Sequence, residues 1–392
     1  MKRSVRIAAA LSVSVCVAAM SAVTPSARAA TFTATTGAVF NNPLVEADKW
    51  KVPDHFIDLI NAADTGSQIN VAEYVFATRP VADALVAASA RGIQVRVVVD
   101  HESATYDTNP GYDVLKAAFA DFDSLTSTQR LTRSWLQTCS SGRACLAGAP
   151  TERNPIQHNK FLLLSSVAGQ KVVVEASQNL TTTNMWNNAV TVVGDDQLYG
   201  HFFTYFNRLA HNEHNDDNVY DDFGGTGTTN SSKVWFFPRA VPASGNQNGN
   251  DTIGDILANV ACSGARIRIG MRNLDDDRQR IATELVDCAR AGATVEIVYS
   301  EMGTDFRDII KQSSRITRYR MGDALPSVHS KYMTVDGTFS GTAGKWIFTG
   351  SHNYDRDSLR DNDESLLRLN NSGVFAQFQA NFDAMKAVAT PM

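Results

Sequence analysis

The sequence contains two similar halves, and this internal duplication constrains the fold more than any other feature. Each half begins with a helical pattern, a glycine-containing turn and an apolar strand, at 59–71 and at 257–269. A second helix and a second apolar strand follow at 81–99 and at 280–298. Strands that alternate with helices favour parallel pairing. We therefore predict an α/β protein of two similar α/β sandwich halves, with mostly parallel sheets flanked by helices and packed about a pseudo-two-fold axis.

Each half also carries a His-x-Lys triplet directly before an apolar, strand-like run. The triplets begin at His158 and His329 and reach Lys160 and Lys331 two positions later. Residues two apart in a strand point to the same side, so each triplet offers an imidazole and an ammonium group to one surface. Two such couples facing each other would form a cationic pocket with two proton-transfer groups, which suits phosphodiester cleavage without a metal ion. The alternative is chance triplets in surface strands, and the duplication argues against it.

A Ser-x-Asn motif ends a later apolar strand in each half, at Ser177 and Asn179 and again at Ser351 and Asn353. The motif recurs at the corresponding place of the second half. This agreement supports the duplication independently of the His-x-Lys triplets.

The order of segments predicts a signal peptide over 1–29, a first repeat over 30–222, a linker over 223–233 and a second repeat over 234–392. The linker is rich in Gly, Thr and Ser. A phosphate-binding glycine loop is the alternative, but no lysine follows at the required spacing. The first repeat carries a long insertion, roughly 106–154, which either shapes access to a substrate or is a surface ornament.

The N-terminus begins with Lys2, Arg3 and Arg6, continues with an apolar stretch over 7–23 and reaches small residues around Arg28. This order is typical of a secretory signal peptide. A membrane anchor is disfavoured because the apolar core is short for a span. No later segment is apolar enough to cross a bilayer, so we predict a soluble, secreted protein with no transmembrane segment.

Loss of the signal peptide would remove four positive charges and change the formal net charge from −5 to about −9. Basic surface supplies most of the affinity of proteins for nucleic acid. The acidic balance therefore weighs against a processive nuclease, although a local basic cleft can exist in an acidic protein.

Four cysteines remain after the signal peptide: Cys139, Cys145, Cys262 and Cys288. An even number in an exported protein predicts two disulfides. Sequence order favours Cys139 with Cys145 and Cys262 with Cys288, although four cysteines allow three pairings. The spacing does not suit a zinc site.

These motifs, on a duplicated chain, resemble the phospholipase D superfamily. Its signature is His-x-Lys-x4-Asp, followed downstream by Gly-Ser-x-Asn and a later acidic residue. The resemblance covers most of the mature chain. The second half matches the signature in full, at His329, Lys331, Asp336, Gly350, Ser351, Asn353, Asn362 and Glu364.

The first half departs from this signature. Ser165 occupies the place of the signature Asp, and Ala176 replaces the Gly of Gly-Ser-x-Asn. The resemblance implies that the signature Asp is structural, so Ser165 is expected to affect stability rather than chemistry.

The later acidic residue is also missing from the first half. With the Ser-x-Asn motifs aligned, Asn188 corresponds to Asn362, and Val190 corresponds to Glu364. Such a carboxylate would orient an imidazole and stabilise its protonated form. Glu175 is a possible substitute, at an unusual position.

The resemblance implies a two-step reaction through a phosphohistidine, with no metal and no cofactor. One histidine attacks phosphorus, while the other protonates the departing alcohol and then takes a proton from water. Because Glu364 would orient the imidazole of its own half, we expect His329 to attack and His158 to act as the acid. The implied catalytic residues are His158, Lys160, His329, Lys331 and Glu364, the phosphate-binding residues are Ser177, Asn179, Ser351 and Asn353, and the structural residues are Asp336, Asn188 and Asn362.

The implied function is that of a secreted, monomeric phosphodiesterase. It would hydrolyse glycerophospholipids at a membrane or micelle surface to phosphatidic acid and the headgroup alcohol. Two alternatives stay open: a nuclease of the same superfamily, and a catalytically silent phosphate-binding member. The nuclease would need a basic track near the pocket, for which the candidates are Arg266, Arg268, Arg272, Arg315, Arg318 and Arg320.

Overall fold

The computed structural model describes residues 32–392 except 107, 148–153, 182, 215–231 and 247–248. The predicted signal peptide lies outside the described residues. Within the described ranges, no helix combines the length and the apolar character that a membrane span requires.

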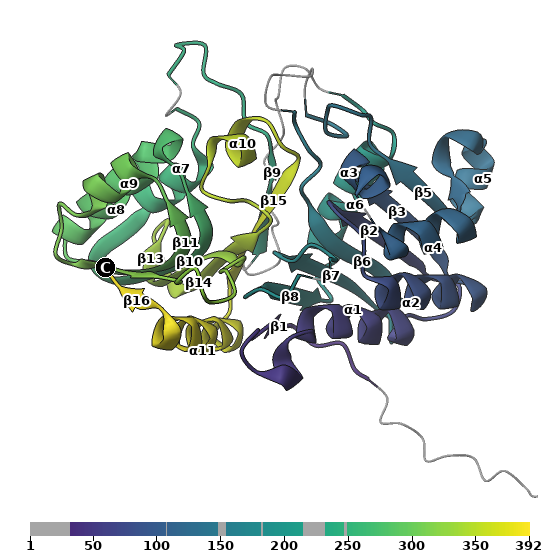
Figure 1. Cartoon of the computed structure of the whole chain (residues 1–392), viewed down its shortest axis with the longest axis horizontal. Coiled ribbons are helices and arrows are strands. Elements are labelled where there is room, and N and C mark those ends of the chain that lie inside the picture. Colours follow the sequence, from purple (N-terminus) through teal and green to yellow (C-terminus); the bar gives the residue numbers. More distant parts are fainter. Residues whose placement is uncertain (1–31, 107, 148–153, 182, 215–231, 247–248) are drawn as a thin grey trace, which may run out of the picture. The chain divides into compact units, whose positions relative to one another are not determined.

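The strands of the first half form one mixed sheet, which has eight strands in the described part of the chain (Figure 1). Its inner strands are apolar on both faces because helices cover both sides. Along β6, Leu162 and Leu164 face one core cluster, whereas Phe161 and Leu163 face another. Neighbouring strands follow the order β1 (Gly37–Phe40), β8 (Asn188–Val193), β7 (Gln170–Ala176), β6 (Lys160–Val167), β2 (Gln68–Glu73), β3 (Gln94–Val99), β5 (Trp135–Thr138) and β4 (Ala120–Asp121).

The second half repeats this plan with a sheet of its own, again of eight described strands. From β8 to β5 in the first sheet and from β15 to β12 in the second, corresponding strands occur in the same order, which confirms the duplicated α/β fold. The order is β16 (Thr390–Pro391), β12 (Ile316–Arg320), β11 (Thr294–Met302), β10 (Val260–Leu274), β13 (Lys331–Phe339), β14 (Thr342–Gly350), β15 (Glu364–Asn370) and β9 (Ser232–Phe237).

The expectation of mostly parallel sheets is wrong, since both sheets are mixed. Strands β2, β3 and β5 run parallel, as do β10, β11 and β12, but β6 and β13 pair antiparallel with their neighbours on both sides. On one side of each His-x-Lys strand, the cause is the tight turn that follows the strand. Ala168 and Gly169 join β6 to β7, and Ser340 and Gly341 join β13 to β14, all with positive φ. A two-residue turn of this kind can connect only antiparallel strands.

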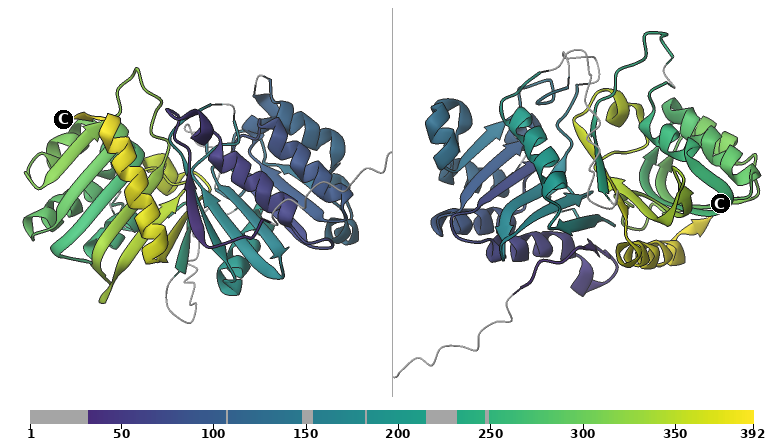
Figure 2. Two further views of the ribbon diagram at one scale, coloured as in Figure 1. Left: turned by 90° about the horizontal axis from the view of Figure 1, so that it is seen from below. Right: turned by 180° about the vertical axis from the view of Figure 1, so that it is seen from behind.

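Helices cover both faces of each sheet. In the first half α1, α2 and α4 lie on one face and α6 on the other, whereas in the second half α7, α8 and α9 lie opposite α11 (Figure 2). The helices of the first half are α1 (Lys51–Ala62), α2 (Arg79–Ala90), α3 (His101–Thr105), α4 (Pro110–Ala118), α5 (Ser127–Thr132) and α6 (Asp196–Ala210). Those of the second half are α7 (Thr252–Ala258), α8 (Gln279–Arg290), α9 (Thr304–Ile310), α10 (Arg356–Arg360) and α11 (Ser372–Val388), and short 3-10 turns span Glu46–Asp48, Phe122–Ser124 and Asp276–Arg278.

Two segment boundaries differ from the sequence prediction. The supposed insertion at 106–154 is not a long loop, because it contains α4, α5, β4 and β5, and β5 extends the first sheet beside β3. Residues 223–231 of the predicted linker lie outside the described residues. Its last two residues, Ser232 and Lys233, belong to β9.

The two disulfides join the cysteines that sequence order favoured. Cys139 pairs with Cys145 directly after β5, and Cys262 pairs with Cys288, which links β10 to α8. The first disulfide closes a short loop of the first half, and the chain that leaves this loop contacts the second half, as described below.

Candidate active site

The histidine of each triplet is held by a loop of the other half. His158 lies just before β6, and its backbone N–H donates to the carbonyl oxygen of Asp363 at 2.8 Å. His329 lies just before β13, and its backbone N–H donates to the carbonyl oxygen of Trp186, also at 2.8 Å. Isolated parallel bridges stand at both places. This exchange of loops builds one site from both halves.

The two lysines complete the triplets. Lys160 and Lys331 are the first residues of β6 and β13, and each ammonium group donates to the carbonyl oxygen of its own histidine, at 2.5 and 2.8 Å. Burial lowers the pKa of His158 and of His329 well below the usual value, and the charges of both lysines lower it further. Because the charges of both ammonium groups lower the pKa of each histidine, the four side chains lie near one another at a single site.

Glu364 pairs with the histidine of the other half. Its Oε1 lies 2.8 Å from Nδ1 of His158, and its second oxygen accepts a hydrogen bond from the Ser351 hydroxyl. Burial raises the pKa of this fully buried carboxyl to about 7. A carboxylate on Nδ1 keeps the imidazole proton there and leaves a lone pair on Nε2. The expected pairing of Glu364 with His329 of its own half is therefore wrong, because the halves exchange their loops.

His329 has an amide partner instead. Its Nδ1 lies 2.9 Å from Oδ1 of Asn187, and the Ser177 hydroxyl donates to the same oxygen at 3.1 Å. Asn187 of the first half therefore corresponds to Glu364 of the second half. The sequence alignment had matched Val190 to Glu364 instead. The alignment assumed equal spacing, but the connection from Ser177 to Asn187 is 10 residues long and that from Ser351 to Glu364 is 13.

The serines of the Ser-x-Asn motifs orient these partners. Both hydroxyls are fully buried, and they donate to Asn187 and Glu364 rather than pointing to an open site. The expectation that Ser177 and Ser351 donate to phosphate is therefore corrected. Their hydroxyls position Asn187 and Glu364, which in turn orient the imidazoles of His329 and His158.

The asparagines of the same motifs are better placed to meet a ligand. Oδ1 of Asn179 and Oδ1 of Asn353 are buried and have no hydrogen-bond partner among the described residues. A buried polar atom without a partner is costly in a folded protein. These atoms are oxygens, which only accept hydrogen bonds, so a phosphate could be met only by the Nδ2 group of each amide.

The residues expected to be structural make hydrogen bonds or ion pairs with groups other than the two histidines. Asn188 donates from Nδ2 to the Thr349 hydroxyl at 2.8 Å, and Asn362 accepts from the backbone N–H of Ile156 at 3.2 Å, both across the two halves. Asp336 lies half exposed near the far end of β13, where it pairs with Lys345 at 2.6 Å.

Two further buried carboxyls surround Lys160. Glu73 lies opposite Lys160 on β2, and Glu175 lies on β7, one residue along the register. Burial raises the pKa of both well above the usual value. Glu175 accepts from the Ser365 hydroxyl at 2.9 and 3.0 Å and so does not replace the missing partner of His329. Sequence reasoning missed Glu73, although an acidic residue in an apolar strand was a usable signal.

A cavity of about 160 Å³ opens beside these groups. Its lining comes from the first half, which includes Asn187, except for His329 of the second half. The Tyr74 ring in its wall lies 5.2 Å from the His158 ring, centroid to centroid. The remaining lining comprises Val75, Glu102, Tyr106, Asn179, Thr181, Thr183 and Met185.

No group of three or more His, Cys, Asp or Glu side chains in the described ranges is arranged to hold a metal ion. The ammonium groups of Lys160 and Lys331, both of which are buried, bring positive charge to the site. These groups and the two imidazoles can bind an anionic diester and move protons at it.

Comparisons with known proteins agree with this geometry. A family model described as "Cardiolipin synthase, PLD-like domain" matches residues 56–210 and 256–386, which is more than half of the chain. A search of curated protein sequences gives no significant match.

The solved structures that are similar in fold include the following two. Phosphatidylserine synthase from Haemophilus influenzae has a TM-score of 0.59 at 13% identity, over 91% of this chain and 87% of that chain. Polyphosphate kinase from Porphyromonas gingivalis has a TM-score of 0.58 at 14% identity, over 90% of this chain, which spans only 50% of the kinase. The family match covers both halves, and each matched segment contains one His-x-Lys triplet. The chain therefore belongs to the phospholipase D-like family.

Proposed function

We propose that this protein is a secreted phospholipase D-type phosphodiesterase, which hydrolyses glycerophospholipids to phosphatidic acid and the headgroup alcohol. The observation that carries the proposal is the unequal pairing of the two histidines, with a carboxylate on His158 and an amide on His329. Two imidazoles at one diester must differ in role, because one attacks while the other donates a proton. The two disulfides support export, since such bonds persist in oxidising compartments.

The pairing supports different roles for the two histidines. Nε2 of His158 attacks phosphorus, and the P–O bond to the headgroup breaks as the P–N bond forms. Glu364 stabilises the positive charge that develops on this imidazole. Protonated His329 gives its proton to the departing oxygen, because a neutral amide does little to retain it. His329 then takes a proton from water, whose oxygen attacks phosphorus and breaks the P–N bond.

The lysines and asparagines bind the phosphate in this scheme. The ammonium groups of Lys160 and Lys331 and the amides of Asn179 and Asn353 would face the non-bridging oxygens. Preorganised donors of this kind contribute roughly 3–4 kcal/mol each to transition-state stabilisation.

The cavity beside His329 supports a cationic headgroup. Tyr74 and Tyr106 give it aromatic walls, and Glu102, which accepts a hydrogen bond from the Tyr74 hydroxyl, adds a carboxylate. Aromatic faces and a carboxylate attract choline or ethanolamine, whereas a nucleotide would bring further negative charge.

A nuclease is the second candidate, and one arginine favours it. Arg272 is close enough to His329 to lower its pKa. The rest of the predicted basic track is largely neutralised, since Arg266 and Arg268 pair with Glu296, and Arg320 pairs with Asp323. Even Arg272 pairs with Glu301 at 2.7 Å.

The test is turnover by the purified protein on phosphatidylcholine and phosphatidylethanolamine vesicles and on single- and double-stranded DNA. We expect headgroup release that His158→Ala and His329→Ala abolish and that His211→Ala, on the exposed end of α6, leaves intact. DNA cleavage without headgroup release would establish the nuclease instead. A well-folded protein without turnover on any diester would establish the silent phosphate-binding member.

The assignment of roles has its own test. Brief reaction with a labelled diester, followed by acid quench and peptide mapping, should place the phosphoryl label on the peptide that contains His158. Label on the His329 peptide would reverse the two roles without affecting the family assignment.

A further inference from the structure

An exposed apolar loop, residues 41–50, connects β1 to α1. The buried side chain of Asn41 closes the base of this loop. Its Oδ1 accepts from the backbone N–H of Val52 at 2.9 Å, and its Nδ2 donates to Oε1 of Gln178 at 2.6 Å. Gln178 is the middle residue of the Ser-x-Asn motif of the first half. The loop is therefore fixed to a segment that also supplies the candidate active site.

The loop contacts the wall of the cavity beside His329 as well. The backbone N–H of Asn41 donates to the carbonyl oxygen of Asn187 at 3.0 Å. Nδ2 of Asn184 donates to the carbonyl oxygen of Pro43 at 3.4 Å. Asn187 lines that cavity, and so do both chain neighbours of Asn184. These hydrogen bonds hold the loop beside the cavity.

Three large apolar side chains of the loop face solvent. Leu44 is 45% exposed, Val45 is 44% exposed and Trp50 is 36% exposed. Eight large apolar side chains are exposed in the described ranges, so three of the eight lie on this one loop, and a fourth, Tyr106, lines the cavity itself. Exposed apolar residues that occur singly are ordinary, whereas a group of them beside a site marks an interaction surface.

The charged side chains next to these residues are balanced. Lys49 forms an ion pair with Glu46, and Lys51 pairs with Asp48 at 2.7 Å. The loop and the first residue of α1 therefore carry no net charge. Anionic lipids and nucleic acids are attracted by clusters of Lys and Arg, which this surface does not offer. A zwitterionic lipid layer fits it better, because burial of the apolar side chains alone would supply the affinity.

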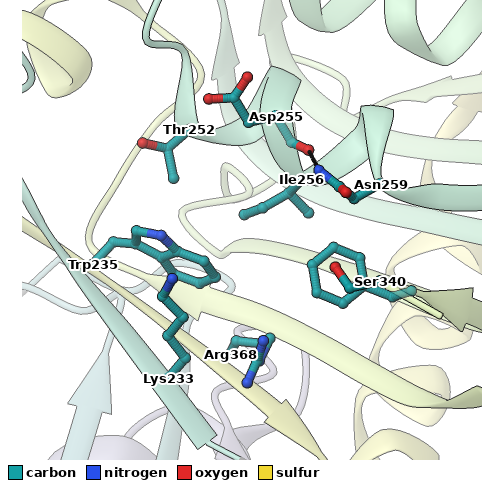
Figure 3. A pocket seen from close by; sticks show the side chains of 9 residues that line it. Lys233, Trp235, Thr252, Asp255, Ile256, Asn259, Ser340 and Arg368 are labelled. Carbon is teal, nitrogen blue, oxygen red and sulfur yellow. Dashed lines mark hydrogen bonds between the residues drawn. The ribbon is translucent and has the colours of Figure 1, made fainter. Parts of the chain in front are cut away.

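The acyl chains of the proposed substrate need a place outside the protein. The cavity beside His329 measures about 160 Å³. A second cavity, between α7 and the sheet of the second half, measures about 250 Å³, and its lining includes the charged side chains of Lys233, Asp255 and Arg368 (Figure 3). Sites for drug-sized ligands usually measure roughly 300–1,000 Å³, and two long acyl chains are larger than such a ligand. Neither cavity can hold them, so the acyl chains must stay in the lipid layer while the headgroup reaches the histidines.

We propose that Leu44, Val45 and Trp50 form a membrane-docking surface, which inserts into a zwitterionic lipid layer and holds the cavity beside His329 against the headgroups. This inference rests on the phospholipid substrate of the proposed function. Leu44 and Val45 enter the region where headgroups meet acyl chains. Trp50 stays at the headgroup level, which is the usual depth of an indole at a membrane surface.

The first test is vesicle binding by the His158→Ala protein, which cannot complete the proposed reaction. We expect it to bind phosphatidylcholine vesicles. The added double substitution Leu44→Ser and Val45→Ser should weaken this binding roughly tenfold or more, since burial of even one such side chain contributes about that much. Two control substitutions should leave the binding unchanged: Leu131→Ser, which alters a more exposed apolar side chain on α5, and Glu46→Gln, which alters a charge on the same loop.

Two outcomes of this test would overturn the proposal. The first is equal binding by the double variant, with its fold checked by thermal unfolding. The second is binding that occurs only on vesicles containing phosphatidylglycerol and disappears at high salt, because it would show attraction between charges in place of apolar insertion.

Trp50 provides a second readout. The other four tryptophans of the chain are buried, so a change of indole environment at the surface reports on Trp50. Binding to phosphatidylcholine vesicles should shift the fluorescence emission to shorter wavelength, and Trp50→Phe should abolish that shift while most of the binding persists. Binding without any shift would place the contact on another part of the protein.

Turnover separates this inference from the proposed function. With His158 intact, the double variant should hydrolyse monomeric dibutyrylphosphatidylcholine as fast as the wild-type protein does. It should hydrolyse long-chain phosphatidylcholine vesicles roughly tenfold more slowly. Equal losses on the two substrates would refute the docking surface. If the wild-type protein binds vesicles through this loop but hydrolyses neither lipid, the proposed function is wrong and the docking surface stands. Dimerisation of the wild-type protein that the double substitution abolishes would instead assign the loop to a contact between two copies.

Discussion

The carboxylate of Glu364 lies 2.8 Å from Nδ1 of His158, and the two residues come from different halves of the chain. The duplication places Asn187 at the corresponding position, 2.9 Å from Nδ1 of His329. One exchange of loops thus gives two histidines with the same backbone environment and different partners. The carboxylate on one histidine and the amide on the other make the site of this duplicated fold asymmetric.

The first prediction concerns the charged partner. Glu364→Gln preserves the shape of the residue but removes the charge that stabilises the His158 imidazolium. We expect kcat to fall by roughly 10²–10⁴, the range for a group that acts through general acid–base or triad chemistry. The measurement is steady-state headgroup release, with Glu46→Gln, which is exposed, as the matched control. Retention of full activity by Glu364→Gln would contradict this role.

The second prediction concerns the neutral partner. Asn187→Asp would give His329 a carboxylate and raise its pKa, since an opposite charge favours the protonated imidazole. Histidine protonation, followed by NMR with a His329→Gln spectrum for assignment, should persist to higher pH in this variant. If His329 is the acid, proton transfer to the leaving group should become slower, because its proton is held more firmly. An unchanged His329 titration would show that Asn187 does not tune it.

The sequence predicted those features of the site that depend on neighbouring residues, and it did not predict contacts between residues far apart in the chain. The His-x-Lys triplets and the Ser-x-Asn motifs are local patterns, and they stand in the structure where strand periodicity puts them. The pairing of Glu364 with His158 could not be read locally, because it depends on which loop reaches across the interface. Asn187 was missed for a related reason, since the connection that bears it is three residues shorter than its counterpart and has no equivalent of α10 among its described residues.

The third prediction is a narrow pH optimum. Burial raises the pKa of Glu364 to about 7, so this carboxyl gains the charge that its role requires only as the pH rises through 7. Burial lowers the pKa of Lys160 to about 8, so the ammonium group loses the charge that phosphate binding requires as the pH rises through 8. The proton donor His329 must also keep its proton, and burial lowers its pKa well below the usual value. The profile of kcat/KM should therefore be bell-shaped, because Glu364 must lose its proton while His329 and Lys160 must keep theirs. Glu364→Gln should lose the acidic limb and keep the alkaline one.

The fourth prediction concerns the disulfide between Cys139 and Cys145. The backbone N–H groups of Leu146 and Ala147, directly after it, donate to the Asp363 carboxylate at 2.9 and 2.7 Å. Asp363 in turn accepts from His158 through its carbonyl oxygen. The double substitution Cys139→Ser and Cys145→Ser should therefore lower kcat/KM at a temperature where the protein remains folded.

The other disulfide provides the control for that experiment. Cys262 and Cys288 join β10 to α8, away from the two histidines. Their replacement by serine should lower the free energy of unfolding, by an amount of the order of 2–4 kcal/mol, without changing kcat/KM of the folded protein. Equal losses of activity in the two variants would show that the first disulfide has no special connection to the site.

The fifth prediction concerns headgroup choice. Glu102 lines the cavity beside His329 and accepts a hydrogen bond from the Tyr74 hydroxyl. Glu102→Gln keeps the hydrogen bond and removes the charge, so the attraction to a cationic headgroup is lost while the aromatic walls remain. We expect kcat/KM to fall for phosphatidylcholine and phosphatidylethanolamine and to change little for phosphatidylglycerol, whose headgroup is uncharged. Tyr106→Phe, which preserves the ring in the same cavity, is the matched control and should not alter the ratio. A uniform loss on all three lipids would mean that Glu102 supports the fold of the cavity rather than its selectivity.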